Sequence, residues 1–205
     1  MIDPLTLLAF VPAALVLALS PGPEMMFCLG QGLRGGRCAG VLAAAGLVPG
    51  PLIGVTLMAL GLASVTEAAP GAFPLVRWIG AGYLLWLAWR ALRGDVAAPE
   101  AARSGAGRTF GGSLLVGITS PKGAGFVFAL LPQFIDPAGP VLAQFLILGA
   151  ILAASGFAVN ATVGAFAGRF APLLMQSPGL GRLLRWLTAG VFGALAARML
   201  IGGRA

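Results

Sequence analysis

The amino-acid sequence predicts an all-α integral membrane protein with six transmembrane helices, arranged as two inverted repeats of three helices. Composition, six long apolar stretches and a matched pair of helix breaks lead to this fold class. Of the 205 residues, 59% are hydrophobic and 9% are charged, and the mean hydropathy is +0.96. Soluble domains carry about 25% charged residues, which excludes a soluble enzyme, a disordered chain and a nucleic-acid-binding domain. The 32 glycines fit closely packed membrane helices, in which small residues let backbones approach.

Six apolar stretches approach the length of about 20 residues that a membrane-spanning helix needs. They cover residues 5–29, 39–63, 74–92, 111–134, 140–165 and 183–201. The N-terminus lacks the basic region of a cleaved signal peptide, so we expect the first span to be retained. A polar segment between the third and fourth spans divides the chain into two halves. The predicted parts are a first repeat over 1–95, a polar cytoplasmic linker over 96–110 and a second repeat over 111–205.

Arginines predict the orientation of these spans, because cytoplasmic loops carry an excess of basic residues. Nine arginines follow the first, third and fifth spans, and three lie on the opposite side. The nine are Arg34, Arg37, Arg90, Arg93, Arg103, Arg108, Arg169, Arg182 and Arg185, and the three are Arg77, Arg198 and Arg204. Both termini are therefore expected outside the cytoplasm.

Two of the six spans are interrupted at matching places, 100 residues apart. The interruptions are Ser20-Pro21-Gly22-Pro23 in the first span and Ser120-Pro121-Lys122-Gly123 in the fourth. Proline removes a backbone donor and clashes with the preceding turn, so neither run continues as an ideal helix. Two halves of three spans each cross the membrane in opposite senses. The matched breaks therefore predict an inverted repeat with its binding site at the two broken helices.

One acid and one lysine lie inside predicted spans, each beside a break. Glu24 is the only acid well inside a span, and Lys122 is the only lysine of the chain. An ionised group at this depth must be paired, protonated or in contact with water, so Glu24 is a candidate proton-responsive group. Lys122 is a candidate partner for a substrate carboxylate or for Glu24. In the alternative interpretation, Glu24 only satisfies amides at a helix start, and Lys122 extends to the cytoplasmic interface.

Other polar and small residues have more ordinary interpretations. The loosened backbone at both breaks offers amides and carbonyls, which makes a small amino acid compatible with the site without selecting it. Asn160 in the fifth span either bridges helices or lines the path. Gly46, Gly50 and Gly54 recur at four-residue spacing and predict a helix-packing seam.

The sequence offers no catalytic apparatus. The absence of histidine excludes a Ser-His intramembrane protease and an HExxH metalloprotease. There is also no acidic cluster to hold a metal and no GxxxxGK[ST] loop to cradle a nucleotide. We therefore expect no enzyme activity, no metal and no cofactor.

Several motifs, taken in order, resemble the lysine exporter superfamily of LysE/RhtB-type amino acid exporters. They are the first break, the run Gly35-Gly36-Arg37-Cys38-Ala39-Gly40, Pro121-Lys122, Leu131-Pro132-Gln133-Phe134 and the third-span run from Trp78 to Trp89. The resemblance implies a bacterial inner-membrane protein of about six spans that expels amino acids or related metabolites, driven by the proton gradient. It carries over to Pro21, Gly22, Pro23, Pro121 and Lys122.

This chain departs from that family's pattern at three positions. Family members commonly have asparagine where this chain has Glu24 and Ser120, and many have an acid where it has Pro51. The usual buried acid is thus missing from the second span, and an unusual one stands in the first. We therefore expect Glu24 to take over the charge-coupling role.

The predicted function is a secondary transporter that exports amino acids or related small zwitterionic metabolites across the bacterial cytoplasmic membrane. Alternating access of the two halves, coupled to protons, would move the substrate. Its expected partners are the substrate, protons and the lipid bilayer, with no nucleic acid, and a homodimer is neither required nor excluded. Two alternatives stay open at this point: a passive channel for small solutes, and a structural or assembly subunit of a membrane complex.

Overall fold

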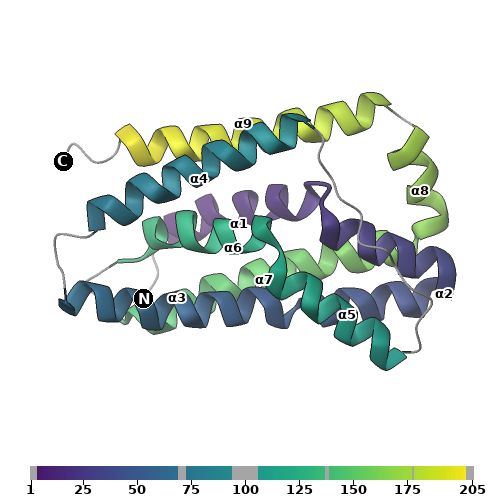
Figure 1. Cartoon of the computed structure of the whole chain (residues 1–205), viewed down its shortest axis with the longest axis horizontal. Coiled ribbons are helices and arrows are strands. Elements are labelled where there is room, and N and C mark those ends of the chain that lie inside the picture. The colour runs from purple at the N-terminus through teal and green to yellow at the C-terminus, as the bar shows by residue number, and fades with distance from the viewer. Residues whose placement is uncertain (1–3, 69–72, 94–105, 137–138, 177, 202–205) are drawn as a thin grey trace.

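A computed structural model describes residues 4–68, 73–93, 106–136, 139–176 and 178–201. Over these residues the protein is all-helical and contains no strand, as the sequence predicts (Figure 1). The elements are α1 (Pro4–Leu19), α2 (Pro23–Leu47), α3 (Pro49–Ala68), α4 (Phe73–Arg93), α5 (Ala106–Thr119), α6 (Pro121–Leu130), the 3-10 helix η2 (Leu131–Phe134), α7 (Val141–Ala165), α8 (Ala167–Gln176) and α9 (Pro178–Ile201).

The helices are interrupted at both places where the sequence predicts a break. α1 ends at Leu19 and α2 begins at Pro23, and α5 ends at Thr119 and α6 begins at Pro121. Each new helix begins with proline, whose missing N–H would have no partner inside the helix at this position. Proline thus ends one helix and starts the next.

The connection between the first two predicted spans is helical rather than a loop. α2 runs through residues 30–38 and leaves helical geometry only at Gly36, with φ 76° and ψ −172°. This left-handed backbone conformation favours glycine, because it is strained for residues with a Cβ. Figure 1 shows α2 turning back in this region. The first span therefore continues through the first half of α2, and the second half of α2 leads into α3.

The predicted linker is shorter in the structure than in the sequence prediction. Residues 106–110 form the start of α5, so the first helix of the second half begins before residue 111. The rest of the predicted linker lies outside the described residues. The short helix α8, between α7 and α9, was not predicted.

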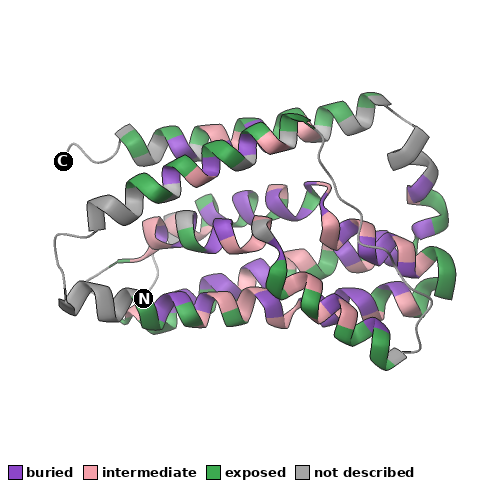
Figure 2. Cartoon of the chain, viewed as in Figure 1, coloured by how far each residue is buried: buried purple, intermediate pink, exposed green. Residues whose placement is uncertain are grey.

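The core is built where helices of the two halves meet. α7 packs chiefly against α2 and also contacts α1 and α3, whereas α4 packs chiefly against α9 (Figure 1). The ring of Phe10 lies 6.0 Å from that of Phe126 and 5.2 Å from that of Phe134, measured between centroids. Figure 2 shows buried residues along α1, α6 and α7 and many exposed residues on α4 and α9.

The outer surface is strongly apolar. Exposed large side chains include Leu8, Leu57, Trp78, Ile79, Leu115, Leu183 and Trp186. Among the described residues, two helical runs are long and apolar enough to cross a bilayer: residues 23–61, which include the turn at Gly36, and Val141–Ala165. Such a surface suits contact with lipid tails, which do not penalise exposed apolar side chains.

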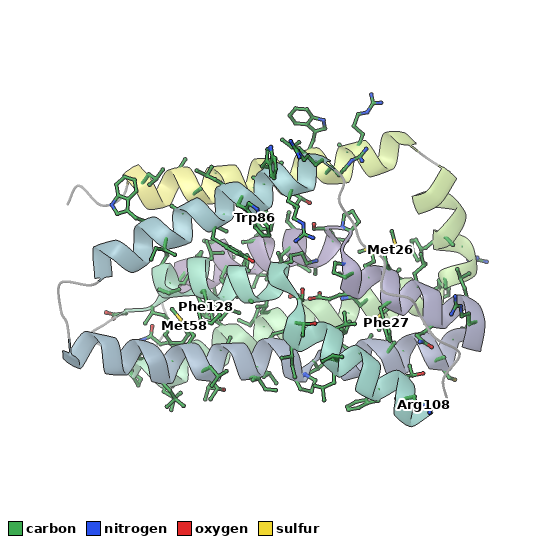
Figure 3. The ribbon with its side chains drawn as sticks, viewed as in Figure 1. Met26, Phe27, Met58, Trp86, Arg108 and Phe128 are labelled. Atoms are coloured by element: carbon green, nitrogen blue, oxygen red, sulfur yellow. The ribbon has the colours of Figure 1, made fainter. Side chains whose placement is uncertain are left out.

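Most of the described arginines lie toward one end of the molecule. Figure 1 places the start of α1 and the end of α9 toward one end, and the turn of α2, the C-terminal end of α4, the start of α5, α8 and the start of α9 toward the other. The latter segments carry Arg34, Arg37, Arg90, Arg93, Arg108, Arg169, Arg182 and Arg185. Arg108 is labelled there in Figure 3, and Arg103 and Arg204 lie outside the described residues. We call this part of the molecule the basic end; its assignment to the cytoplasm stays a prediction.

Two arginines at the basic end lie over tryptophan rings. The guanidinium carbon of Arg90 is 5.3 Å from the centroid of the Trp86 ring, and that of Arg93 is 3.9 Å from the Trp89 centroid. Cation–π contacts of this kind combine a charge with an aromatic ring of the type that is enriched at membrane interfaces.

Candidate functional site

The two helix breaks lie against each other in space. The Nζ of Lys122, in the first turn of α6, donates hydrogen bonds to the carbonyl oxygens of Leu17 at 2.9 Å and Ser20 at 3.0 Å. Carbonyls at the C-terminal end of a helix lack the amides of a following turn, and this helix end carries partial negative charge. The ammonium group of the second half therefore caps the broken helix of the first half.

A charged side chain lies beside a glycine at each break. A Cβ atom at Gly22 would lie 3.6 Å from the Nζ of Lys122, and a Cβ atom at Gly123 would lie 3.6 Å from the Oε1 of Glu24. Lys122, which follows the second break, thus lies over the first. Glu24, which follows the first break, lies over the second. Each break is therefore covered by the charged side chain that follows the other break.

Glu24 lies close to two helix N-termini. It is half-buried in the first turn of α2, and its carboxylate lies beside Gly123 in the first turn of α6. Helix N-termini carry partial positive charge and favour a carboxylate. Within the described residues, the Lys122 ammonium binds the two α1 carbonyls and not this carboxylate, although the opposite charges attract each other through space.

The caps of the two new helices differ. The buried Ser120 caps α6, because its Oγ accepts a hydrogen bond from the amide of Gly123 at 3.4 Å. Gly22 occupies the same position before α2 and has no side chain to offer. The first amides of α2 are therefore left without a side-chain cap, which is the arrangement that binds anions at helix N-termini.

The structure thus brings most of the predicted site residues together. They are Ser20, Pro21, Gly22, Pro23, Glu24, Ser120, Pro121 and Lys122. Ser20 and Ser120 are buried, and Pro21, Pro23 and Lys122 are half-buried. The group offers an ammonium, a carboxylate, backbone carbonyls and uncapped amides within one region.

Asn160 lies on α7, beside α2. It is buried, and its Nδ2 donates to the carbonyl of Gly156 in its own helix at 2.9 Å. Its Oδ1 has no hydrogen-bond partner among the described residues. The next residue, Ala161, packs in a cluster with Cys28, which lies one turn after Glu24. Asn160 is therefore near the first break but on the side of the basic end.

The predicted glycine seam involves two of its three positions. A Cβ atom at Gly46 would overlap Ser113, and one at Gly50 would lie 2.6 Å from the backbone of Gly117, so both approach α5 closely. Gly54 has no atom of the described residues within 4 Å of the position of a Cβ. A second close contact, which the spacing did not predict, joins α2 and α7: a Cβ at Gly164 would lie 2.8 Å from the Cα of Gly40.

Sequence reasoning also missed the pair formed by Gln31 and Thr109. Both side chains are buried, and the hydroxyl of Thr109 on α5 donates to the Oε1 of Gln31 on α2 at 3.4 Å. The Nε2 of Gln31 has no partner. The available signal was a glutamine inside an apolar helical stretch, where polar side chains are uncommon and often functional.

Comparison with known proteins identifies the family. The sequence model described as LysE type translocator matches residues 15–203, which include both breaks. The chain belongs to the LysE type translocator family. The resemblance that the motifs indicate is thereby confirmed, and this family consists of translocators rather than enzymes.

Two relatives carry names that state what they export. The translocator is 36% identical over 144 residues to a homoserine/homoserine lactone efflux protein of Salmonella typhimurium (strain LT2), covering 69% of this chain and 70% of that protein. It is 31% identical over 198 residues to a leucine efflux protein of Enterobacter sp. (strain 638), covering 93% and 92%.

A third relative is known only as a membrane protein. The chain is 33% identical over 145 residues to an uncharacterized membrane protein of Vibrio cholerae, covering 69% of this chain and 71% of that protein. No solved structure matches the chain.

Proposed function

We propose that this translocator exports small amino acids across the bacterial cytoplasmic membrane, with the substrate bound between the two helix breaks. The observation that carries the proposal is the pair of hydrogen bonds from Lys122 to the broken end of α1, with the Glu24 carboxylate at the same junction. Family membership supports transport, and relatives named for homoserine and leucine efflux support an amino acid as substrate.

The groups at the breaks complement both charges of a zwitterion. Lys122 and the uncapped amides of α2 would bind the substrate carboxylate, and Glu24 would bind the substrate ammonium. The carbonyls of Leu17 and Ser20, which hold Lys122 in the structure, would accept from the substrate ammonium when Lys122 turns toward the carboxylate. Lys122 and the two carbonyls would thus have hydrogen-bond partners both with and without substrate.

Competition at Glu24 would couple export to proton entry. The ionised carboxylate binds the substrate ammonium, whereas a proton from outside removes this charge and releases the substrate outward. When the site faces the cytoplasm, the proton leaves and a new substrate binds. Proton and substrate thus occupy Glu24 in turn, which is the requirement for exchange of one for the other.

Alternating access would arise from movement of the two halves around the breaks. The breaks lie where the halves meet, and the contacts across them are few hydrogen bonds and small residues. We assign an inverted repeat to the halves and the cytoplasmic side to the basic end, so that both termini face outward. Rocking of one half against the other would expose the breaks to each side in turn.

Counterflow in proteoliposomes tests this proposal. Purified protein is reconstituted into vesicles loaded with unlabelled homoserine or leucine, and uptake of the labelled amino acid is measured with and without a pH gradient. We expect transient accumulation driven by exchange, and a further dependence on the pH gradient. Equilibration without accumulation would indicate a passive channel, and absence of any flux from the purified chain would indicate a subunit of a larger complex.

A further inference from the structure

Two buried amide side chains in the inner part of the molecule each have an unpartnered atom. Within the part of the chain that the structure describes, the Nε2 of Gln31 and the Oδ1 of Asn160 have no hydrogen-bond partner, and the residues are 4% and 3% exposed. A buried polar group without a partner is unfavourable, so native structures rarely retain one unless something else satisfies it. One atom is a donor and the other is an acceptor.

The hydrogen bonds of the remaining amide atoms agree with these roles. The hydroxyl of Thr109 donates to the Oε1 of Gln31, which leaves Nε2 as the free atom. The Nδ2 of Asn160 donates to the carbonyl of Gly156, which leaves Oδ1 as the free atom. The structure therefore presents a free donor on α2 and a free acceptor on α7.

The packing of α2 against α7 brings the two residues to neighbouring levels. Gly32, directly after Gln31, packs against Gly164 and Ala167, and Asn160 lies one turn before Gly164. Cys28, three residues before Gln31, shares a cluster with Ala161, the residue after Asn160. One helical turn rises about 5.4 Å, so these contacts place Gln31 and Asn160 within about one turn of each other along the contact between α2 and α7.

The third side of this region is α5. Phe27, labelled in Figure 3, lies against Gly112 of α5, and Gln31 follows on the same face of α2 one turn later, where Thr109 binds it. Gln31 is seven residues past Glu24 toward the turn at Gly36, or about 10 Å along the helix. The amides therefore lie between the helix breaks and the basic end.

We propose that Gln31 and Asn160 form a subsite that binds the side-chain hydroxyl of an amino acid passing between the basic end and the breaks. A hydroxyl accepts from the Nε2 of Gln31 and donates to the Oδ1 of Asn160 at the same time, whereas an aliphatic side chain does neither. The subsite rests on the proposed function and narrows it, because it favours hydroxylated amino acids over aliphatic ones.

Homoserine and norvaline give a direct test, because they differ only by a hydroxyl in place of a methyl group. In counterflow with the reconstituted protein, we expect homoserine to be preferred over norvaline by about tenfold or more, as for sites that hydrogen-bond a substrate hydroxyl. Gln31→Met and Asn160→Leu should bring this preference to within about twofold while norvaline exchange continues. Thr162→Val is the matched control on α7, since its exposed hydroxyl binds only its own helix, and it should keep the preference.

Binding provides a second measurement that does not depend on the variants. Homoserine should raise the thermal unfolding temperature of the wild-type protein more than norvaline at equal concentration. Equal shifts, absence of a preference in counterflow, or variants that exchange and keep the preference would each overturn the subsite and leave amino acid export intact. Exchange of neither amino acid, nor of leucine, would overturn both the subsite and the proposed function.

Discussion

The two helix breaks share a sequence pattern but differ in local structure. At the first break residues 20–22 lie outside the helices, and the N-cap Gly22 has no side chain. At the second break only Ser120 separates α5 from α6, and its hydroxyl caps the new helix. The second break is therefore internally satisfied, whereas the first leaves amides and carbonyls that need partners from elsewhere.

The charged residues at the two breaks also differ. The first is followed by an acid and the second by a base, and each side chain lies over the other break. The wide first break obtains its cap from Lys122, in the other half of the chain. A repeated motif thus provides two matching interruptions, while the unequal residues around them leave one break capped by its own serine and the other capped from the second half of the chain.

The largest effect is expected from removing the ammonium group of Lys122, which caps the end of α1. Lys122→Met keeps an unbranched side chain but loses the charge and both hydrogen bonds, so counterflow should fall by at least about tenfold. Lys122→Arg keeps the charge and should retain part of the activity. Full counterflow in Lys122→Met, with the protein monodisperse in detergent, would show that the two breaks are independent.

The second largest effect is expected at Glu24, and it separates substrate exchange from coupling to protons. Glu24→Gln keeps the shape of the side chain but cannot ionise, so export driven by a pH gradient should be lost while the protein still folds. Residual counterflow should no longer depend on pH between about 5 and 8, because no histidine and no other acid is present at the breaks. A variant that still accumulates substrate against its gradient in response to pH would refute the coupling role.

A smaller effect is expected at the closed break. Ser120→Ala removes the cap of α6, which should destabilise the protein by about 1 kcal/mol, as measured by thermal unfolding in detergent. Ser120→Thr, which retains the hydroxyl, should restore most of this loss. Substrate affinity should change little, and a large change in affinity without a change in stability would place Ser120 in the binding site.

The smallest effect is expected from giving the open break a cap of its own. Gly22→Ser adds a hydroxyl at the N-cap of α2, where the backbone is extended and a Cβ has room beside Lys122. Stability should change by only a few tenths of a kcal/mol. Because the hydroxyl would occupy amides assigned to the substrate carboxylate, affinity should weaken measurably; unchanged affinity would remove these amides from the binding site.

Much of the fold could be predicted because helix breaks and apolar length are local properties. The prolines at positions 21, 23 and 121 set the boundaries of four helices, and these appear where expected. The turn within α2 could not be predicted as helical on both sides, because it depends on the φ of a single residue, Gly36, which packing selects. The glycine seam failed at Gly54 for the same reason: spacing places glycines on a face but does not say whether another helix lies opposite.

The site was only partly readable from the sequence. Glu24 and Lys122 could be singled out because charges are scarce in membrane spans. The contact between Gln31 and Thr109 could not be predicted, since 78 residues separate them and no pattern in the sequence pairs the two positions. Their contact follows from how α5 packs on α2.

The sequence by itself determined the membrane class, the family, the two breaks and the two charges beside them. These follow from composition and from the fixed effects of proline and charge on a helix in an apolar medium. Only the tertiary structure decided that Lys122 caps α1 while Glu24 lies at two helix N-termini. It also decided that the buried amides of Gln31 and Asn160 each have an atom without a partner among the described residues. Those facts depend on which helix ends meet, and such meetings are set by packing between segments far apart in the chain.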